Sequence, residues 1–133
     1  MVRVLANGVF DLFHYGHLMH LEQASTFGDY LIVSITKDKF VGKGPGRPVY
    51  TETHRAAIVA ALKCVDEVII VSGLGEALLK VKPQIVVKGT DYKKLDSAHD
   101  EYCKLYGIEV KFTDTPKLSA TGFLNESLRR SRV

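Results

Sequence analysis

The fold is decided by one stretch, Asn7-Gly8-Val9-Phe10-Asp11-Leu12-Phe13-His14-Tyr15-Gly16-His17. It follows an apolar run at residues 2–6 and precedes an amphipathic segment at residues 18–27, so it predicts a strand, a turn and a helix start. His14 and His17 are three residues apart, which places both imidazoles on one face of a helix. Gly16 lies between them and lets a ligand approach the backbone closely.

The two histidines of this turn have three possible roles: metal ligands, structural side chains or phosphate contacts. A zinc-protease pattern needs Glu after the first histidine, and Tyr15 occupies that position. The N-terminus of a helix offers unpaired N–H groups and the positive end of a dipole, both of which suit phosphate. We therefore interpret His14 and His17 as a polyphosphate site and expect no protein-bound metal there.

The composition favours a single domain over residues 1–133, with about residues 129–133 as a frayed tail. Hydrophobic residues make up 46% of the chain and charged residues 25%, which is enough for an ordinary core. The net charge of +3 fits an anionic small-molecule ligand. This charge is too low for a typical nucleic-acid-binding protein, so we expect no nucleic-acid partner.

The cysteine content and the hydropathy pattern predict a cytoplasmic protein. Cys64 and Cys103 form no Cys-x-x-Cys pair, which favours a reducing compartment over a zinc site or a disulfide scaffold. The N-terminus lacks the charged and apolar regions of a signal peptide. The longest apolar runs are too short to span a bilayer, so we expect no membrane partner.

Apolar strand-like and amphipathic helix-like segments alternate along the chain. Strands are predicted at residues 2–6, 30–35, 67–71, 85–87 and 108–112, and helices at residues 18–27, from Thr51 onward, 75–81, 97–106 and 120–129. This alternation predicts an α/β fold, a Rossmann-like three-layer sandwich with a five-stranded parallel sheet and helices on both faces. A Gly-x-Gly-x-x-Gly fingerprint and a Walker A loop are both missing from the sequence.

Ligands of such sheets bind beyond the C-terminal ends of the strands, near the point where the strand order reverses. Polar loops follow the predicted strands and should meet at this edge: residues 8–17, 36–48, 88–92 and 113–121. Their convergence predicts one site to which all of these loops contribute.

Basic residues after the second strand allow two interpretations each. Lys43 and Arg47 either fold over phosphates or belong to a solvated basic loop. Arg55 lies in the first turn of the second helix, where a cation opposes the helix dipole. It either faces an anionic ligand or pairs with an acid such as Glu52.

The last two loops supply further polar candidates. Lys88 and Asp91 follow the fourth strand, where a polar group has a functional or a capping role. Ser119 and Thr121 open the last predicted helix. They serve as helix caps, as phosphate contacts, or as both.

The residues from Gly8 to His17 resemble the Gly-x-Phe-Asp…His-x-Gly-His signature of the cytidylyltransferase-type nucleotidylyltransferases. Other segments resemble the adenylyltransferase domain of ADP-heptose synthases, namely residues 44–49, the helix with Arg55, residues 87–92 and Ser119-Ala120-Thr121. The resemblance covers nearly the whole chain.

This resemblance implies transfer of a nucleotidyl group from ATP or CTP to a phosphorylated sugar or polyol, with release of pyrophosphate. It also implies Mg²⁺, bound through the nucleotide phosphates, and a homodimer. The catalytic residues implied by the resemblance are His14, His17, Lys43 and Arg55. The nucleotide-binding residues implied in the same way are Gly8, Val9, Phe10, Asp11, Gly16, Lys88, Gly89, Asp91, Ser119 and Thr121.

Alternative functions stay open at this point. In the last loop, Asp114 and Ala120 stand where glycerol-3-phosphate cytidylyltransferases have arginine and threonine. This difference favours an acceptor of the heptose 1-phosphate type, with glycerol 3-phosphate as the alternative. A nucleotide-binding module without catalysis is the alternative from another class. A metallohydrolase would need a third ligand near the histidines.

Overall fold

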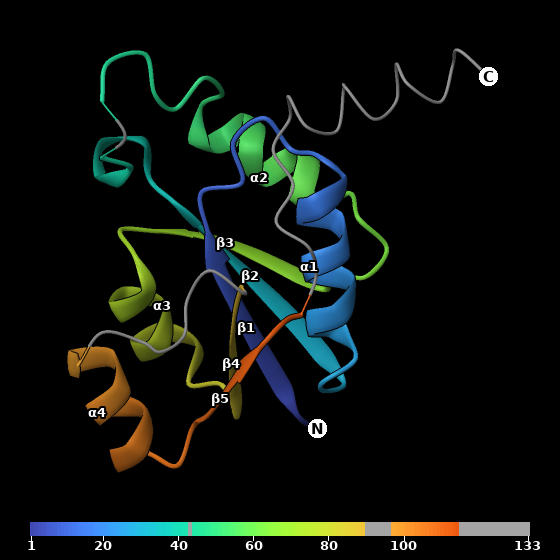
Figure 1. The fold of residues 1–133 in the computed structure, drawn as a ribbon, viewed down its shortest axis with the longest axis vertical. Helices are drawn as coiled ribbons and strands as arrows, with labels where there is room; N and C mark the ends of the chain where they lie inside the picture. Colours follow the sequence, from blue (N-terminus) through green and yellow to red (C-terminus); the bar gives the residue numbers. More distant parts are fainter. Residues whose placement is uncertain (43, 90–96, 115–133) are drawn as a thin grey trace.

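The computed structural model describes residues 1–42, 44–89 and 97–114, in which strands and helices alternate (Figure 1). The elements in chain order are β1 (Arg3–Gly8), α1 (Tyr15–Ser25), β2 (Tyr30–Thr36), the short 3₁₀ helix η1 (Asp38–Phe40), α2 (Glu52–Ala60), β3 (Glu67–Val71), α3 (Leu74–Val81), β4 (Ile85–Lys88), α4 (Ser97–Leu105) and β5 (Glu109–Phe112). The predicted alternation is confirmed within these residues, and the predicted helix at residues 120–129 lies outside them. None of the described helices is long and apolar enough to cross a membrane.

The five strands form one parallel sheet in the order β3-β2-β1-β4-β5. The chain first builds outward from β1 to β2 and β3, and then crosses back to place β4 on the other side of β1. The strand order therefore reverses between β1 and β4, which is where such sheets bind ligands. The predicted five-stranded parallel sheet is confirmed.

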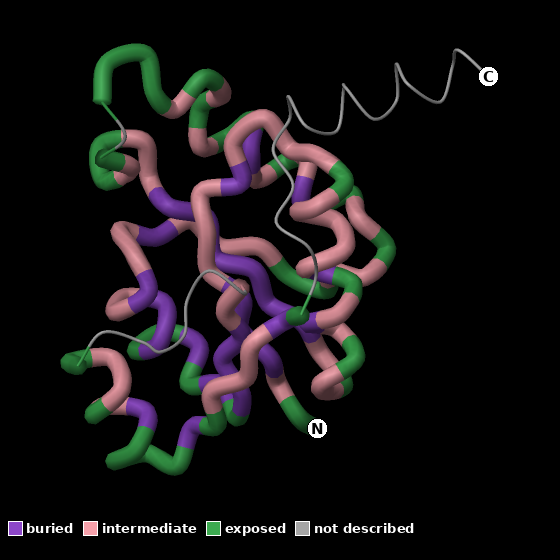
Figure 2. Tube along the Cα trace, viewed as in Figure 1, coloured by how far each residue is buried: buried purple, intermediate pink, exposed green. Residues whose placement is uncertain are grey.

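Apolar side chains cover both faces of the sheet and attach a helical layer to each. Val4 and Ala6 of β1 belong to the cluster in which α1 and α2 pack, and Leu5 belongs to the cluster formed with α3 and α4. All three side chains are fully buried, and the central strands are buried along most of their length (Figure 2). Strands covered on both faces need near-continuous apolar sequences, which these strands have. The predicted three-layer sandwich is confirmed.

Helix α1 begins earlier than its apolar pattern predicts. The predicted start at residue 18 is wrong, because the helix begins at Tyr15 with His14 as its N-cap residue. Gly16 and His17 therefore lie within the first turn. The pattern missed this turn because imidazole nitrogens here take the place of the Ser, Thr, Asp or Asn oxygens that usually cap helices.

Gly28 allows the connection between α1 and β2 to pass close to β1. A Cβ at this position would lie 2.6 Å from Val4 Cγ2 and 2.7 Å from the carbonyl oxygen of Val2. Because that oxygen belongs to the backbone, it can move only if the start of β1 shifts. Gly28→Ala should lower the free energy of unfolding, measured by urea denaturation, by about 1–3 kcal/mol.

The matched control is Gly73→Ala, since a Cβ at Gly73 would meet no atom within 4 Å. A loss of stability in Gly28→Ala no larger than in this control would contradict the role given to Gly28.

Candidate functional site

The turn between β1 and α1 has an unusual backbone conformation. Phe10 and Leu12 have φ angles of 54° and 48°, in the left-handed region that non-glycine residues seldom adopt. The Phe10 ring lies so close to Gly8 that a Cβ there would be 2.7 Å from Phe10 Cε2. A side chain at position 8 would therefore displace the Phe10 ring from its place in this turn. Strained backbone of this kind concentrates at functional sites.

His14 and His17 cap helix α1 reciprocally. His14 Nδ1 accepts a hydrogen bond from the Gly16 N–H (3.1 Å), and His17 Nδ1 accepts one from the His14 N–H (3.2 Å). The two rings are stacked, with their centroids 3.9 Å apart. This arrangement is a capping box built from imidazoles in place of the usual Ser and Glu. The prediction that both imidazoles share one side of the helix start is confirmed.

These hydrogen bonds determine where each ring carries its proton. A ring nitrogen that accepts an N–H carries no proton itself, so the neutral imidazoles of His14 and His17 are protonated at Nε2. Burial lowers the pKa of His14 below its ordinary value of 6.5, which favours the neutral ring at neutral pH. The turn thus carries two neutral Nε2–H donors at a helix N-terminus.

The rings of Phe10 and Phe13 pack against the His17 ring. The Phe10 ring meets the His17 ring edge-on, with 5.6 Å between centroids, and the Phe13 ring lies 5.2 Å away. Phe10 itself is buried in the core beneath the turn. The orientation of His17 is therefore fixed by packing as well as by its hydrogen bond.

Asp11 ties this turn to the loop between β2 and α2. Its carboxylate accepts hydrogen bonds from the N–H groups of Val49 (2.7 Å) and Tyr50 (2.9 Å), and Arg47 Nη1 lies 3.5 Å away. Burial raises the pKa of Asp11, but the backbone N–H groups of Tyr50, Val49 and Leu12 and the charge of Arg47 together lower it below 3.8. Asp11 is therefore ionised at neutral pH and acts as a loop anchor.

Arg55 is buried behind the turn. Its side chain is 0% exposed and donates hydrogen bonds to the carbonyls of Tyr50 (3.0 Å) and Val9 (2.8 Å) and to Asp38 Oδ1 (2.6 Å). The ion pair with Glu52 that the sequence suggested is not formed, because Glu52 Oε1 instead accepts the N–H of Asp38 (2.8 Å). In this structure the buried Arg55 side chain joins the β1–α1 turn to the β2–α2 loop through hydrogen bonds and does not reach the surface.

The end of β4 lies beside the end of β1, because Ala6 and Val87 are opposite each other in the sheet. This pairing brings Lys88 and Gly89 to the same edge as Gly8. Among the residues that the structure describes, no atom lies within 4 Å of a Cβ placed at Gly89. The structure thus brings together the loop after β1 and the beginning of the loop after β4.

Sequence reasoning missed one polar contact at this edge. His20 Nδ1 lies 2.8 Å from Thr113 Oγ1, and the N–H of Thr113 donates to the Lys88 carbonyl (2.9 Å). Burial, and then the charge of Lys88, lower the pKa of His20 below 6.5. No local pattern in the sequence points to this contact, because its two partners are 93 residues apart.

Several predicted site residues lie outside the described residues: Lys43, Asp91, Ser119 and Thr121. Their assignments therefore stay predictions. Arg47, on the same loop as Lys43, is about half-exposed and pairs with Asp11. Among the residues that the structure describes, no group of three or more His, Cys, Asp or Glu side chains is placed to bind a metal ion.

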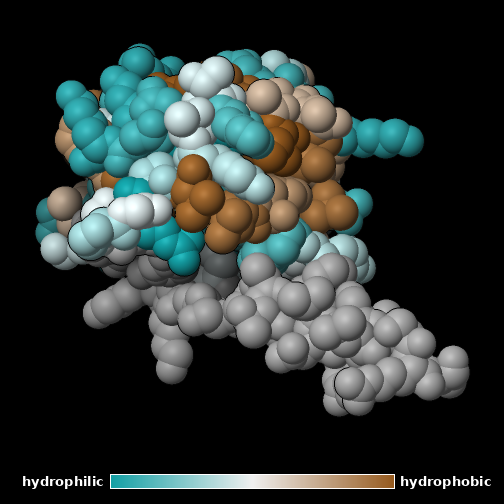
Figure 3. Space-filling view, turned by 90° about the horizontal axis from the view of Figure 1, so that it is seen from above, coloured by the Kyte–Doolittle hydropathy of each residue, from teal (hydrophilic) through white to brown (hydrophobic). Residues whose placement is uncertain are grey.

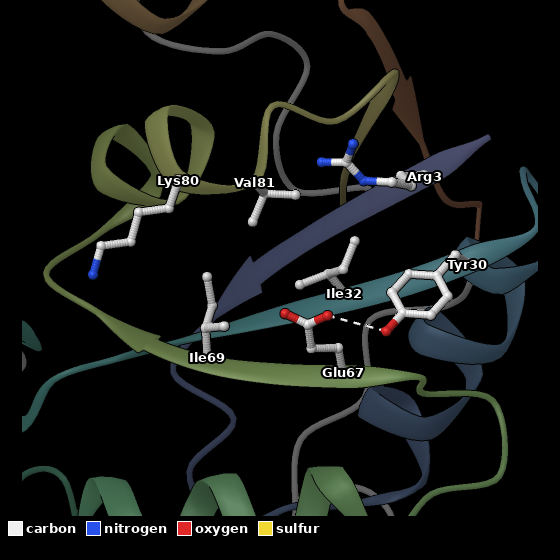
Figure 4. A pocket seen from close by; sticks show the side chains of 7 residues that line it. All are labelled: Arg3, Tyr30, Ile32, Glu67, Ile69, Lys80 and Val81. Atoms are coloured by element: carbon white, nitrogen blue, oxygen red, sulfur yellow. Dashed lines mark hydrogen bonds between the residues drawn. The ribbon is translucent and has the colours of Figure 1, made fainter. Parts of the chain in front are cut away.

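The surfaces at the C-terminal and the N-terminal ends of the strands differ in the side chains that they expose. Seen from above, the molecule presents a broad hydrophilic area beside a smaller group of hydrophobic side chains (Figure 3). At the opposite edge, where β1, β2 and β3 begin, a pocket of about 430 Å³ is lined by Arg3, Tyr30, Ile32, Glu67, Ile69, Lys80 and Val81 (Figure 4). The Tyr30 hydroxyl in this pocket donates to Glu67 (3.0 Å). We place the functional site at the C-terminal edge, because the capped helix and the reversal of strand order coincide there.

Comparison with known sequences shows the family to which the chain belongs. A family model described as Cytidylyltransferase-like matches residues 5–122. The bifunctional protein HldE of Pseudomonas fluorescens (strain Pf0-1) is 42% identical over 132 residues, and that of Pseudomonas putida (strain GB-1) is 41% identical over 132 residues. Each alignment covers 96% of this chain, which spans 28% of the length of either relative.

Solved structures share the fold. The lipopolysaccharide core biosynthesis protein from Thermoplasma volcanium GSS1 has a TM-score of 0.72 and 32% identity, over 90% of this chain and 99% of that one. The pantothenate synthetase from Thermus thermophilus has a TM-score of 0.59 and 16% identity, over 90% of this chain and 57% of that one. The second likeness concerns the fold alone.

The anchoring role of Asp11 predicts a pH-dependent stability difference. Asp11→Asn leaves one carbonyl oxygen for two N–H groups, so the free energy of unfolding should fall by about 1–3 kcal/mol at neutral pH. Because the folded pKa lies below the unfolded value of 3.8, this difference is fully present above that value. It should shrink as the pH falls through the folded pKa, which urea denaturation at several pH values would measure.

The matched control is Glu101→Gln on the exposed surface of α4. If Asp11→Asn were as stable as this control at neutral pH, the carboxylate would not be the anchor of the loop.

Proposed function

We propose that this chain, which belongs to the cytidylyltransferase-like family, is a nucleotidyltransferase that acts on ATP or CTP. The observation that carries the proposal is the reciprocally capped pair of His14 and His17 at the reversal point of the sheet. The pair combines neutral N–H donors with a helix N-terminus, and both suit a triphosphate.

The proposed reaction joins a phosphorylated acceptor to the nucleotide. A phosphate oxygen of the acceptor attacks the α-phosphorus, the bond from this phosphorus to the β-phosphate's bridging oxygen breaks, and pyrophosphate leaves with the electron pair. The second pKa of such an acceptor phosphate is about 6, so it is mostly ionised at neutral pH and needs no general base. The protein must align two polyanions and stabilise the charge that grows on the pyrophosphate.

In this proposal the histidines are hydrogen-bond donors. The Nδ1 atoms of His14 and His17 are occupied by backbone N–H groups, so neither ring can take a proton there without breaking the cap. Each Nε2–H donates to a phosphate oxygen, and the bond strengthens as charge develops in the transition state. Arg55 keeps the turn in place from behind, and Lys43 supplies a cation from the loop after β2.

Mg²⁺ belongs to the proposal as a companion of the nucleotide. Mg²⁺ retains several waters and binds through substrate phosphates with few protein ligands. It would neutralise part of the phosphate charge when bound. The residues of this chain then supply the directional hydrogen bonds.

The acceptor we propose is of the heptose 1-phosphate type, with glycerol 3-phosphate as the alternative. Two likenesses support this choice: the 42% identity to HldE of Pseudomonas fluorescens and the 32% identity to a lipopolysaccharide core biosynthesis protein. Because the chain spans only 28% of the length of HldE, the acceptor has to be identified on this chain itself. We also propose a homodimer, on the family resemblance, and a cytoplasmic location, on the cysteine content.

A matrix of substrates tests this function. The purified chain is incubated with Mg²⁺, each of ATP, CTP, GTP and UTP, and a panel that includes heptose 1-phosphate, other sugar 1-phosphates and glycerol 3-phosphate. We expect pyrophosphate release that requires one triphosphate and one acceptor together. Nucleotide binding without release for every acceptor would contradict the proposal and favour a non-catalytic binding module.

Asparagine at position 14 or 17 tests the donor role of the histidine separately from its helix-capping role. The Asn side-chain oxygen occupies the place of Nδ1 and can accept the same backbone N–H, but no atom replaces Nε2. We expect His14→Asn and His17→Asn to remain folded at the assay temperature and to lower kcat by roughly two orders of magnitude, the usual effect of losing a transition-state donor.

His99→Asn on α4 is the matched control, because its ring lies beside Gly75 on the other face of the sheet. A folded His17→Asn variant with near-wild-type kcat would remove the histidines from the mechanism.

A further inference from the structure

Helix α1 is fastened to the end of β5 by two side chains on its middle turns. His20 Nδ1 lies 2.8 Å from Thr113 Oγ1, and Gln23 Oε1 accepts the N–H of Asp114 (3.1 Å). In Figure 1 the chain leaves β5 toward α1, as these contacts require. The first contact is partly buried, with Thr113 itself 1% exposed, and the second is exposed at the surface.

Thr113 connects α1 to β4 as well as to β5. Its hydroxyl meets His20, and its N–H donates to the carbonyl of Lys88 (2.9 Å), the last residue of β4. The path from His20 through Thr113 to Lys88 therefore links α1 to the C-terminal ends of β5 and β4. One end of this path is α1, the helix that carries His17, and the other end is the last residue of β4.

A buried hydroxyl needs a partner, since leaving it unsatisfied is costly in the interior. A leucine at position 20 would fill a comparable volume without offering one. His20 therefore supplies a hydrogen-bond partner for the Thr113 hydroxyl in addition to packing volume. Its contact joins α1 to the ends of β4 and β5, and the first turn of α1 carries the proposed phosphate donors.

We propose that His20 and Thr113 are positioning residues for nucleotidyl transfer, whose contact fixes the placement of the His14–His17 pair relative to the end of β4. The inference rests on the proposed function and adds residues that touch no substrate. Its physical basis is that reacting groups tolerate little displacement, because an error of about 1 Å can cost roughly a hundredfold in rate.

A double-mutant cycle tests this proposal. His20→Leu and Thr113→Val each remove one partner at nearly constant volume, and the double variant removes both. With the triphosphate and acceptor identified for the wild-type chain, we expect each single variant to lower kcat roughly tenfold and to change the KM for the triphosphate less than about twofold. The double variant should lose no more than the worse single variant.

Conservative variants separate positioning from stability. Thr113→Ser keeps the hydroxyl, and His20→Asn keeps an acceptor and a donor near the place of Nδ1, so both should retain most of the wild-type kcat. His99→Leu is the matched control for loss of a histidine. The Tm of every variant is measured alongside, and the conservative pair keeps the test valid if His20→Leu fails to fold.

The outcomes are distinct. Unchanged kcat in folded His20→Leu and Thr113→Val, losses that multiply in the double variant, or Thr113→Ser as slow as Thr113→Val would each overturn the positioning role. A wild-type chain that releases no pyrophosphate with any triphosphate would overturn the proposed function itself, and this inference with it.

Discussion

The geometry of the site depends on the buried guanidinium of Arg55. It holds the Val9 carbonyl of the β1–α1 turn, the Tyr50 carbonyl before α2 and the carboxylate of Asp38 in η1. A cation that is 0% exposed is stable only while its hydrogen-bond partners are present, because losing one leaves an uncompensated charge. The arginine that the sequence pattern offered to a ligand therefore fixes the loops that surround the ligand site.

The carboxylate of Asp11 is a second charged group that holds this turn in place. Asp11 accepts hydrogen bonds from the N–H groups of Val49 and Tyr50. Two independent charged groups, Arg55 and Asp11, therefore join the turn to the β2–α2 loop. Between these two anchors, His14 Nδ1 accepts the N–H of Gly16 and His17 Nδ1 accepts the N–H of His14, so the donor nitrogen of each ring is Nε2. Donors that are fixed before the substrate arrives need no reorganisation as charge develops, which is the most effective form of electrostatic catalysis.

The sequence was sufficient for the fold, because strands covered on both faces are continuous apolar runs and the helices between them have clear apolar faces. The predicted start of the second helix at Thr51 agrees with the structure, in which Thr51 caps α2 and its hydroxyl oxygen accepts the N–H of His54 (3.2 Å). It failed where a partner comes from a distant element, as in the contact between His20 and Thr113, 93 residues apart. Local spacing carries no information on such pairs, and the same reason explains why Asp38 was not foreseen as the partner of Arg55.

The site works as proposed only if His14 and His17 are neutral, capped through Nδ1, and present Nε2–H to a triphosphate. Long-range proton–nitrogen NMR correlation of the imidazole rings at neutral pH tests this most directly, without nucleotide and then with ATP or CTP and Mg²⁺. We predict Nε2–H tautomers for both rings and a shift of both Nε2 resonances when nucleotide binds. A proton on Nδ1 of either ring, or Nε2 resonances that nucleotide leaves unchanged, would contradict this role for the histidines.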